Sequence, residues 1–217
     1  MVKPIGILGG TFDPVHYGHL RPALEVLQNL ELAEVRFIPC RLPPHRGQPA
    51  ATPAQRLALL QRAVIDQPGF VVDDRELHRA GPSYTVDTLT ALRAEVGAVP
   101  LCLLLGTDAF VSLPSWHRWQ DILALTHVVV MHRPGTVPPW PEPLGRLVAG
   151  RMLQHPTALG ASPAGGIWLQ PVTQLAISAT QIRQLLAHGY SPRYLLPEPV
   201  WTYLRDQNLY RSPSSLL

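Results

Sequence analysis

The alternation of two kinds of apolar segment constrains the fold of this chain more than any other feature. Short strand-like runs occur at 4–8, 35–38, 70–73, 100–105, 126–131 and 167–169. Apolar residues recur with a helical period at 17–30, 53–66, 85–96, 115–125, 178–188 and 199–208, and up to residue 154 after a loop at 133–141. Strands that alternate with helices predict an α/β fold with a single Rossmann-like, doubly wound parallel sheet and helices on both faces.

The chain length suits one domain of this kind. It has 217 residues, of which 46% are hydrophobic, so it can bury a sizeable core. The sequence shows no internal repeat and no linker, and we expect a single domain over 1–217 with a helical C-terminal part from about residue 177. Ligands of such sheets bind beyond the carboxyl ends of the strands, which directs attention to the loops after residues 8, 38, 105 and 131.

The charge composition argues against several classes of function. Charged residues make up only 15% of the chain, which is too few for a disordered charged tail. The net charge is +3 and the basic residues are scattered, so we expect no nucleic-acid binding. Lys3 is the only lysine among 18 cationic residues. This excess of arginine reflects either recognition of anions or a coding bias.

The cysteines and the hydropathy pattern indicate in which compartment of the cell the protein is expected. Cys40 and Cys102 lie in or beside apolar runs and lack the spacing of a disulfide framework or of a metal site. No run reaches 18 apolar residues, and the N-terminal segment lacks the apolar stretch of a signal peptide. We therefore expect a cytoplasmic protein without membrane contact. The sequence leaves the oligomeric state open.

The most informative segment joins the first strand to the first helix and reads Gly-Gly-Thr-Phe-Asp-Pro-Val-His-Tyr-Gly-His at 9–19. The two glycines predict a sharp turn and a close approach to a ligand. The N-terminal turn of the helix attracts anions. His16 and His19 project from one face of that turn because they are three residues apart. Their N–H groups suit a phosphate, and Gly18 leaves room for a group beside the helix.

Two other interpretations of this segment are available. The pair His16 and His19 could be half of a metal site, although no nearby cluster of Cys, His or Asp completes one. The histidines could also be ordinary helix-start residues. The position of the whole motif after a first strand favours the phosphate site. The positive end of the helix predicts that both rings stay neutral until phosphate binds.

A second segment, Ile-Ser-Ala-Thr-Gln-Ile-Arg at 177–183, begins a late helix. Ser178 is a favourable N-cap, and Thr180 and Arg183 lie near the first turn. Together they predict a second anion clamp. Taken alone, the segment fits an ordinary capped helix with a surface arginine better than an anion clamp.

The two segments together resemble the signatures of the nucleotidyltransferase superfamily that adenylylates or cytidylylates phosphates. The superfamily has a second serine where this chain has Ala179. The resemblance implies that His16 and His19 are catalytic and contact the α- and β-phosphates, and that Ser178, Thr180 and Arg183 hold the β- and γ-phosphates. The ATP site that it implies also includes residues of the first loop and helix start and of the segment after the central strand, namely Gly9, Gly10, Thr11, Phe12, Gly18, Gly106 and Asp108.

Three further segments bear on the phosphate acceptor. Pro-Pro-His-Arg at 43–46 places His45 and Arg46 on a loop after a strand, as anion ligands or as a solvated basic loop. Ser-Tyr-Thr-Val-Asp-Thr-Leu at 83–89 begins a helix in which Thr85 offers a hydroxyl and an N–H group, or only caps the helix beside a packed tyrosine. Asp108 follows the central strand, and Trp116 suits stacking on a pyridinium ring unless it is a core residue.

These three segments resemble the bacterial nicotinate-mononucleotide adenylyltransferases, over residues 5–133 and again over 177–186. The resemblance implies that Trp116 stacks on the nicotinate ring and that Thr85 and the backbone near His117 hold its carboxylate. It implies Asp108 on a ribose. The remaining nicotinate mononucleotide ligands that it implies are His45, Arg46, Tyr84 and Arg133.

The implied reaction transfers the adenylyl group of ATP to the 5′-phosphate of nicotinate mononucleotide and releases pyrophosphate, giving deamido-NAD in NAD biosynthesis. The resemblance implies Mg²⁺ that enters with ATP, because Mg²⁺ usually binds through substrate phosphates. Three alternatives remain: an acceptor that is nicotinamide mononucleotide, an acceptor that is phosphopantetheine, and a nucleotide-binding regulator without turnover.

Overall fold

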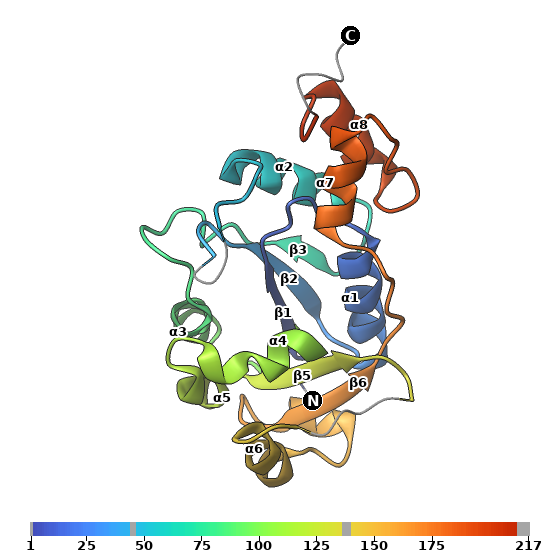
Figure 1. Cartoon of the computed structure of the whole chain (residues 1–217). Helices are drawn as coiled ribbons and strands as arrows, with labels where there is room; N and C mark the ends of the chain where they lie inside the picture. Colours follow the sequence, from blue (N-terminus) through green and yellow to red (C-terminus); the bar gives the residue numbers. More distant parts are fainter. Residues whose placement is uncertain (1, 44–46, 136–139, 212–217) are drawn as a thin grey trace.

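The computed structural model describes residues 2–43, 47–135 and 140–211. Six strands form one sheet in the order β3-β2-β1-β4-β5-β6, and every neighbouring pair is parallel. The strands are β1 (Ile5–Gly10), β2 (Glu34–Pro39), β3 (Phe70–Val72), β4 (Leu101–Gly106), β5 (His127–His132) and β6 (Ile167–Pro171) (Figure 1). The strand order reverses direction between β1 and β4, and this switch point is where doubly wound sheets bind ligands.

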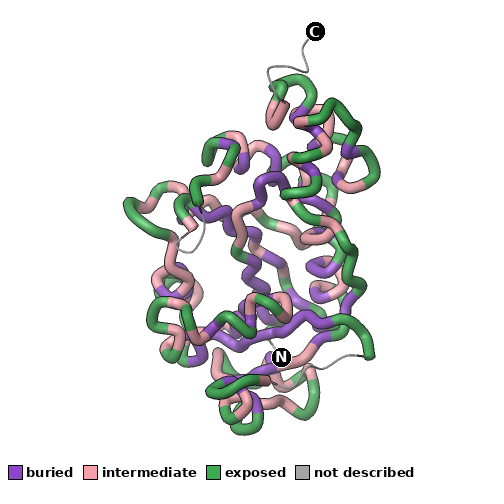
Figure 2. Tube along the Cα trace, in the orientation of Figure 1, coloured by how far each residue is buried: buried purple, intermediate pink, exposed green. Residues whose placement is uncertain are grey.

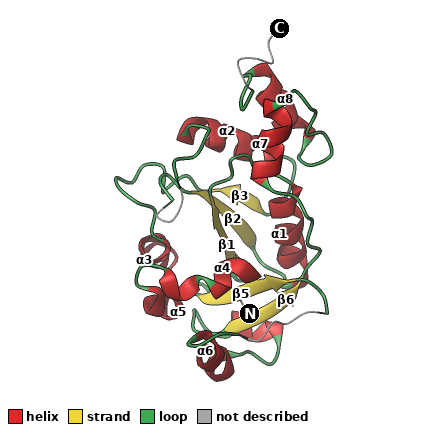
Figure 3. Ribbon diagram, viewed as in Figure 1, coloured by secondary structure: helices red, strands yellow, loops and turns green. Residues whose placement is uncertain are grey.

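Helices cover both faces of the sheet (Figure 3). They are α1 (Tyr17–Asn29), α2 (Pro53–Val64), α3 (Thr85–Val96), α4 (Thr107–Val111), α5 (Ile122–Leu125), α6 (Leu144–Arg151), α7 (Ala179–Ala187) and α8 (Glu198–Asp206). The structure has two hydrophobic cores, and alternate residues of β4 belong to one or the other. Leu103 packs into the core under α3 to α6, whereas Cys102 and Leu104 pack into the core under α1, α2, α7 and α8. The predicted doubly wound α/β fold is therefore confirmed.

Burial follows this layering: in Figure 2 the strands are largely buried, and the exposed residues lie on the outer sides of the helices and in the loops. Ile182 of α7 and Val200 and Leu204 of α8 are buried in the same core as α1 and α2. The C-terminal helices thus share a hydrophobic core with the sheet. In the described parts of the chain, no helix is long and apolar enough to cross a membrane.

Hydrogen bonds fix the starts of two helices, and the cap of the second, at Ser178, was predicted. The Thr52 hydroxyl accepts from the backbone N–H of Gln55 at 3.2 Å, and the Gln55 side chain accepts from the Thr52 N–H at 2.9 Å, which forms a capping box. Ser178 caps α7 by accepting from the Gln181 N–H at 3.1 Å. This cap fixes the point at which the second signature becomes helical.

The prediction of one helix over 115–125 is wrong. Two 3₁₀ turns, Leu113–Ser115 and Trp119–Asp121, precede the short helix α5. Trp116 is extended (ψ 148°) and Arg118 is left-handed (φ 50°), so the backbone cannot continue as a helix between them. The helix α4 after β4 was not predicted.

The predicted helix that reaches residue 154 ends earlier, at Arg151. Met152 has extended torsion angles and bridges to Ile167, and the Leu153 N–H donates to the Ile167 carbonyl at 2.9 Å. Pairing with the edge strand β6 therefore competes with the last turn of the helix and replaces it.

Candidate active site

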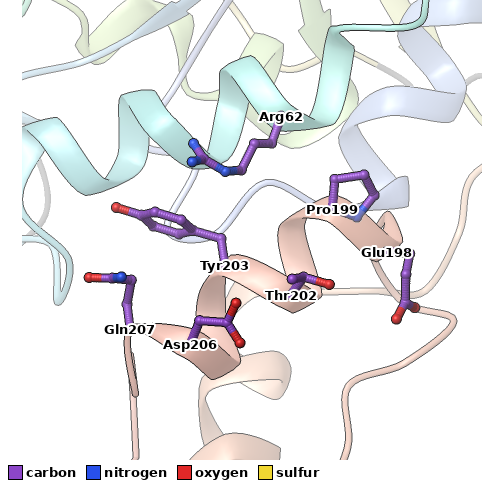
Figure 4. Close-up of a pocket in the computed structure, with 7 residues that line it drawn as sticks. All are labelled: Arg62, Glu198, Pro199, Thr202, Tyr203, Asp206 and Gln207. Carbon is purple, nitrogen blue, oxygen red and sulfur yellow. The ribbon is translucent and has the colours of Figure 1, made fainter.

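A cleft of about 1140 Å³ runs along the carboxyl ends of β1, β2 and β4. Its walls come from β1, α1, α3, β4, α4 and α7, with residues of the loops between them. A second hollow of about 550 Å³ lies between α2 and α8 and contains Arg62 and Tyr203 (Figure 4). None of the predicted site residues lines this second hollow.

The cleft brings together most of the residues predicted for the site. The predicted residues that line it are Gly9, Gly10, Thr11, Phe12, His16, Gly18, His19, Tyr84, Thr85, Gly106, Asp108, Trp116, His117, Ser178, Thr180 and Arg183. Arg133 is exposed after β5 and is not among the lining residues, so its predicted place in the nucleotide pocket is not supported by this geometry. His45 and Arg46 lie outside the described residues.

His16 and His19 form a close pair at the start of α1, with ring centroids 3.8 Å apart. The backbone N–H of His16 donates to Nδ1 of His19 at 3.3 Å. An Nδ1 that accepts a hydrogen bond carries no proton, so the neutral His19 ring carries its proton on Nε2. The local fold thus selects the tautomer whose Nε2–H is available as a donor.

Both histidines are neutral over the physiological range. Burial lowers the pKa of His16 to about 4. Burial, and next the adjacent His16, lower the pKa of His19 to about 3. The predicted neutral imidazoles agree with this result, but desolvation is the main cause rather than the positive end of the helix. A neutral ring can donate a hydrogen bond to a phosphate oxygen without the energetic cost of removing water from a charged imidazolium.

These lowered pKa values predict a specific loss of stability in acid. Below the ordinary histidine pKa of 6.5, unfolded His16 and His19 bind protons that the folded chain does not bind until about pH 4. The free energy of unfolding should therefore fall as the pH falls through this window. Urea unfolding at pH 7 and pH 5 measures the loss, which should be smaller in the double variant His16→Asn/His19→Asn. Equal losses in both proteins would contradict the assignment.

The turn in the first loop is made by Phe12 rather than by the glycines that precede it. Gly9 and Gly10 end β1, and the left-handed residue is Phe12 (φ 51°). The Phe12 ring is buried, with its edge toward His19 at 5.2 Å between centroids and Phe37 at 6.0 Å. Phe12 therefore positions the His19 ring, whereas a Cβ at Gly9 would meet open space beside the cleft.

The space at Gly18 is filled by the protein and not left for a ligand. A Cβ at Gly18 would lie 2.9 Å from Nδ1 of His16 and 3.2 Å from the carbonyl oxygen of Ile177. Gly18 thus allows the His16 ring to lie between α1 and the segment that leads into α7. His16 Nδ1 is buried without a hydrogen-bond partner among the described residues, which shows how closely the ring is enclosed.

A methyl group at Gly18 should therefore displace the pair His16 and His19. We expect Gly18→Ala to lower kcat at least about tenfold, because small displacements of a positioned group have large effects on rate. Circular dichroism should be unchanged, since alanine favours helix. Gly150→Ala is the matched control, because a Cβ there meets nothing within 4 Å. Equal turnover in the two variants would contradict this prediction.

Aromatic and hydroxyl groups line the other end of the cleft. The Tyr84 and His117 rings stack with centroids 4.4 Å apart and an interplanar angle of 32°. Trp116 is half-buried and Thr85 begins α3, and both line the cleft. Trp119 packs on the core and is not among the lining residues.

Asp108 is exposed at the start of α4, directly after β4. It lines the cleft at the end of β4, the strand next to β1 at the switch point. Carboxylates at such strand ends accept hydrogen bonds from ribose hydroxyls.

Arg183 faces the first loop from α7. Its Nη1 donates to the Asp13 carbonyl oxygen at 2.6 Å, and its Nη2 donates to the Thr180 hydroxyl at 3.3 Å. The side chain is 31% exposed, so part of the guanidinium still faces the cleft. Arg183 and Thr180, two of the residues predicted for an anion clamp, are therefore hydrogen-bonded to each other, and Arg183 is also bonded to the first loop.

Three buried polar residues at the site escaped sequence reasoning. Asp13 accepts hydrogen bonds from the backbone N–H groups of Ala50 and Ala51, at 2.8 and 3.0 Å. Arg56 of α2 is fully buried and donates to the Thr11 carbonyl at 2.8 Å. Glu76 lines the cleft and accepts from the Thr88 hydroxyl at 2.6 Å. Only Asp13 carried a signal, namely its place inside the first motif.

The described residues contain no group of three or more His, Cys, Asp or Glu side chains that could hold a metal ion. Cys40 and Cys102 are buried and unpaired with each other, as expected of core cysteines. The donor set of this cleft, which is made of histidines, hydroxyls and an arginine, suits an anion rather than a bare divalent cation.

The fold and the cleft define a nucleotidyltransferase: a parallel sheet with a histidine pair at its switch point and a capped, arginine-bearing helix opposite. Residues 7–185 match the cytidylyltransferase-like family, and the chain belongs to this family. Within it, the chain is 52% identical to a probable nicotinate-nucleotide adenylyltransferase of Aeromonas salmonicida, over 96% of this chain and 98% of the relative. It is 54% identical to a protein of the same name from Halorhodospira halophila, over 98% and 97%.

Solved structures support the fold at lower identity. The nicotinic acid mononucleotide adenylyltransferase of Plasmodium falciparum, complexed with NaAD, superposes with a TM-score of 0.71 at 16% identity, over 96% of this chain and 97% of that chain. A putative nicotinate-nucleotide adenylyltransferase from Vibrio parahaemolyticus superposes with a TM-score of 0.64, over 97% and 96%. Because the sequence identity is so low, these superpositions show only that the backbones are arranged alike.

Proposed function

We propose that this chain transfers the adenylyl group of ATP to the 5′-phosphate of nicotinate mononucleotide. The two products are deamido-NAD and pyrophosphate. One observation carries the proposal: the histidine pair and the aromatic group Tyr84, Trp116 and His117 line the same cleft. The names of relatives that align over nearly the whole chain support the same reaction.

The chemistry requires positioning and charge stabilisation rather than proton removal. The attacking 5′-phosphate is already an anion at neutral pH, so no general base is needed. Its oxygen attacks the α-phosphorus, the bond to the β-phosphate oxygen breaks, and pyrophosphate leaves with the electron pair. We assign His16 and His19 to the α- and β-phosphates, where neutral N–H donors stabilise the growing charge.

Ser178, Thr180 and Arg183 are assigned to the β- and γ-phosphates. Their positions at the start of α7 combine free N–H groups, hydroxyls and a guanidinium fork, which together favour polyphosphate. Mg²⁺ is assigned to the substrate, because the described part of the chain has no group of three or more His, Cys, Asp or Glu side chains for it and Mg²⁺ binds mainly through phosphates. Bound to ATP, the ion would supply positive charge to the leaving pyrophosphate, while Ser178, Thr180 and Arg183 orient the phosphate chain.

The nicotinate end is assigned to the aromatic group. Trp116 presents its π-face to the pyridinium ring, which carries a positive charge. Thr85 and the backbone at His117 are assigned to the carboxylate, and Asp108 to a ribose hydroxyl. Preference for the acid over the amide then depends on donors around one carboxylate, since an amide offers one acceptor fewer.

A release assay tests the proposal. The protein is mixed with Mg-ATP and separately with nicotinate mononucleotide, nicotinamide mononucleotide and phosphopantetheine, and pyrophosphate is measured. We expect release mainly with nicotinate mononucleotide. A preference for either of the other acceptors would change the assigned substrate. No release with any acceptor, alongside measurable ATP binding, would instead indicate a nucleotide-binding regulator.

A further inference from the structure

Asp13 is the meeting point of four segments that are far apart in the sequence. Its carboxylate is buried, with 7% exposure, and both oxygens accept hydrogen bonds from the loop before α2, at Ala50 and Ala51. Its carbonyl oxygen accepts from Arg183 of α7. The fourth segment is the C-terminal end of the described chain, which follows α8.

Tyr210 supplies the contact from this end of the chain. Its hydroxyl donates to Oδ1 of Asp13 at 2.6 Å, across 197 residues of sequence. Burial, and then the hydrogen bond to Asp13, raise the pKa of the Tyr210 phenol, so it keeps its proton and remains the donor. Left-handed backbone at Asn208 (φ 49°) and Tyr210 (φ 64°) turns the chain back toward the cleft after α8.

The same contacts reach the proposed phosphate ligands. Arg183 Nη1 lies 2.6 Å from the Asp13 carbonyl oxygen and 3.8 Å from its Oδ2. Residue 13 therefore fixes the guanidinium through both its main chain and its carboxylate. Asp13 is also three residues before His16, and it directly follows Phe12, whose ring is buried. Any movement of Asp13 would therefore move the arginine and the histidine loop together.

We infer that Asp13 and Tyr210 are a pair of positioning residues that hold Arg183 and the first loop in register for the ATP phosphates. In this arrangement the C-terminal segment, outside the residues that match the family, belongs to the nucleotide site. Neither residue of the pair is assigned a contact with the reacting atoms. The inference rests on the proposed function, because it assigns ATP to this end of the cleft.

The least disruptive test is Tyr210→Phe, which removes one hydroxyl and keeps the ring. The Asp13 carboxylate would keep the hydrogen bonds from the backbone N–H groups of Ala50 and Ala51. It would lose the hydrogen bond from the Tyr210 hydroxyl, which is the shortest of the three. We expect ATP affinity to fall about three- to tenfold, with a similar rise in the KM for ATP, because hydrogen bonds to charged groups are among the stronger ones. The KM for nicotinate mononucleotide should not change, since none of the hydrogen bonds of this pair that the described residues show reaches the aromatic end of the cleft.

Tyr203→Phe is the matched control. Tyr203 lies on α8, and its ring packs against the Arg62 guanidinium at 4.3 Å in the hollow between α2 and α8, away from the cleft (Figure 4). This variant removes the same hydroxyl from the same part of the chain and should bind ATP as the wild type does. Urea unfolding of both variants measures any general loss of stability.

Calorimetric titration with Mg-ATP reads the effect independently of turnover. Weaker ATP binding in Tyr210→Phe, with an unchanged KM for nicotinate mononucleotide, supports the pair. Wild-type ATP affinity in Tyr210→Phe overturns it, and so does an equal rise in both KM values that accompanies a lower unfolding midpoint. Absence of pyrophosphate release by the wild type would contradict the proposed function, while the titration would still decide on the pair.

Discussion

His19→Ala should lower kcat by about 10²- to 10³-fold and leave the fold intact. Removal of one preorganised donor to a developing oxyanion has an effect of this size in other enzymes. In this chain the tautomer is fixed, because the His16 N–H occupies Nδ1 and leaves Nε2–H as the donor. Alanine also favours the helix in which residue 19 lies, so secondary structure should be retained.

Pyrophosphate release at saturating ATP and nicotinate mononucleotide measures this loss. His188→Ala is the control, because His188 is exposed at the end of α7 and bonds only to a carbonyl of its own helix among the contacts described. The control should turn over as the wild type does. Near-normal turnover in His19→Ala would remove His19 from the catalytic assignment.

Arg183→Ala should lower kcat/KM for ATP by about ten- to a hundredfold. A charge-assisted hydrogen bond contributes about 1.5–3 kcal/mol, and about 1.4 kcal/mol corresponds to a factor of ten. Arg183→Lys should recover only part of the loss, because an ammonium group keeps the charge but lacks the planar fork. The fork matters here, since one guanidinium nitrogen bonds to Asp13 and another to Thr180.

Steady-state kinetics with varied ATP measures this change. Arg146→Ala is the matched control, because Arg146 is 82% exposed on α6 and pairs with Glu142 on the same side of the molecule. Its kcat/KM should equal that of the wild type. If Arg183→Ala matched this control, the phosphate assignment of α7 would be wrong.

Local sequence patterns predicted the class of fold, and most of the predicted site residues line the cleft. Periods of two and of 3.6 residues, capping residues and strand-end motifs depend on neighbours within a few positions, which a sequence displays directly. For this reason Ser178 was recognised as a helix cap, and the histidine pair was placed on one face of α1. The two errors in helix extent, at Trp116 to Arg118 and at Met152, arose where tertiary pairing or a left-handed residue interrupted a helical pattern.

The role of Gly18 shows a different limit. The sequence indicates that this position lacks a side chain, but not which group takes the space. The structure places the His16 ring on one side and the Ile177 carbonyl on the other. Ile177 is 159 residues away, and its approach depends on the packing of α7 against α1 in one core.

The sequence by itself therefore determined the class of fold, the reaction type suggested by two motifs, and a set of candidate phosphate ligands that line one cleft. Only the tertiary structure decided how those motifs are held together. Asp13 meets Arg183 across 170 residues and Tyr210 across 197, and Arg56 reaches Thr11 from another helix. Contacts at such separations leave no periodic or local signal, because they form only when the sheet and its two helical layers have packed.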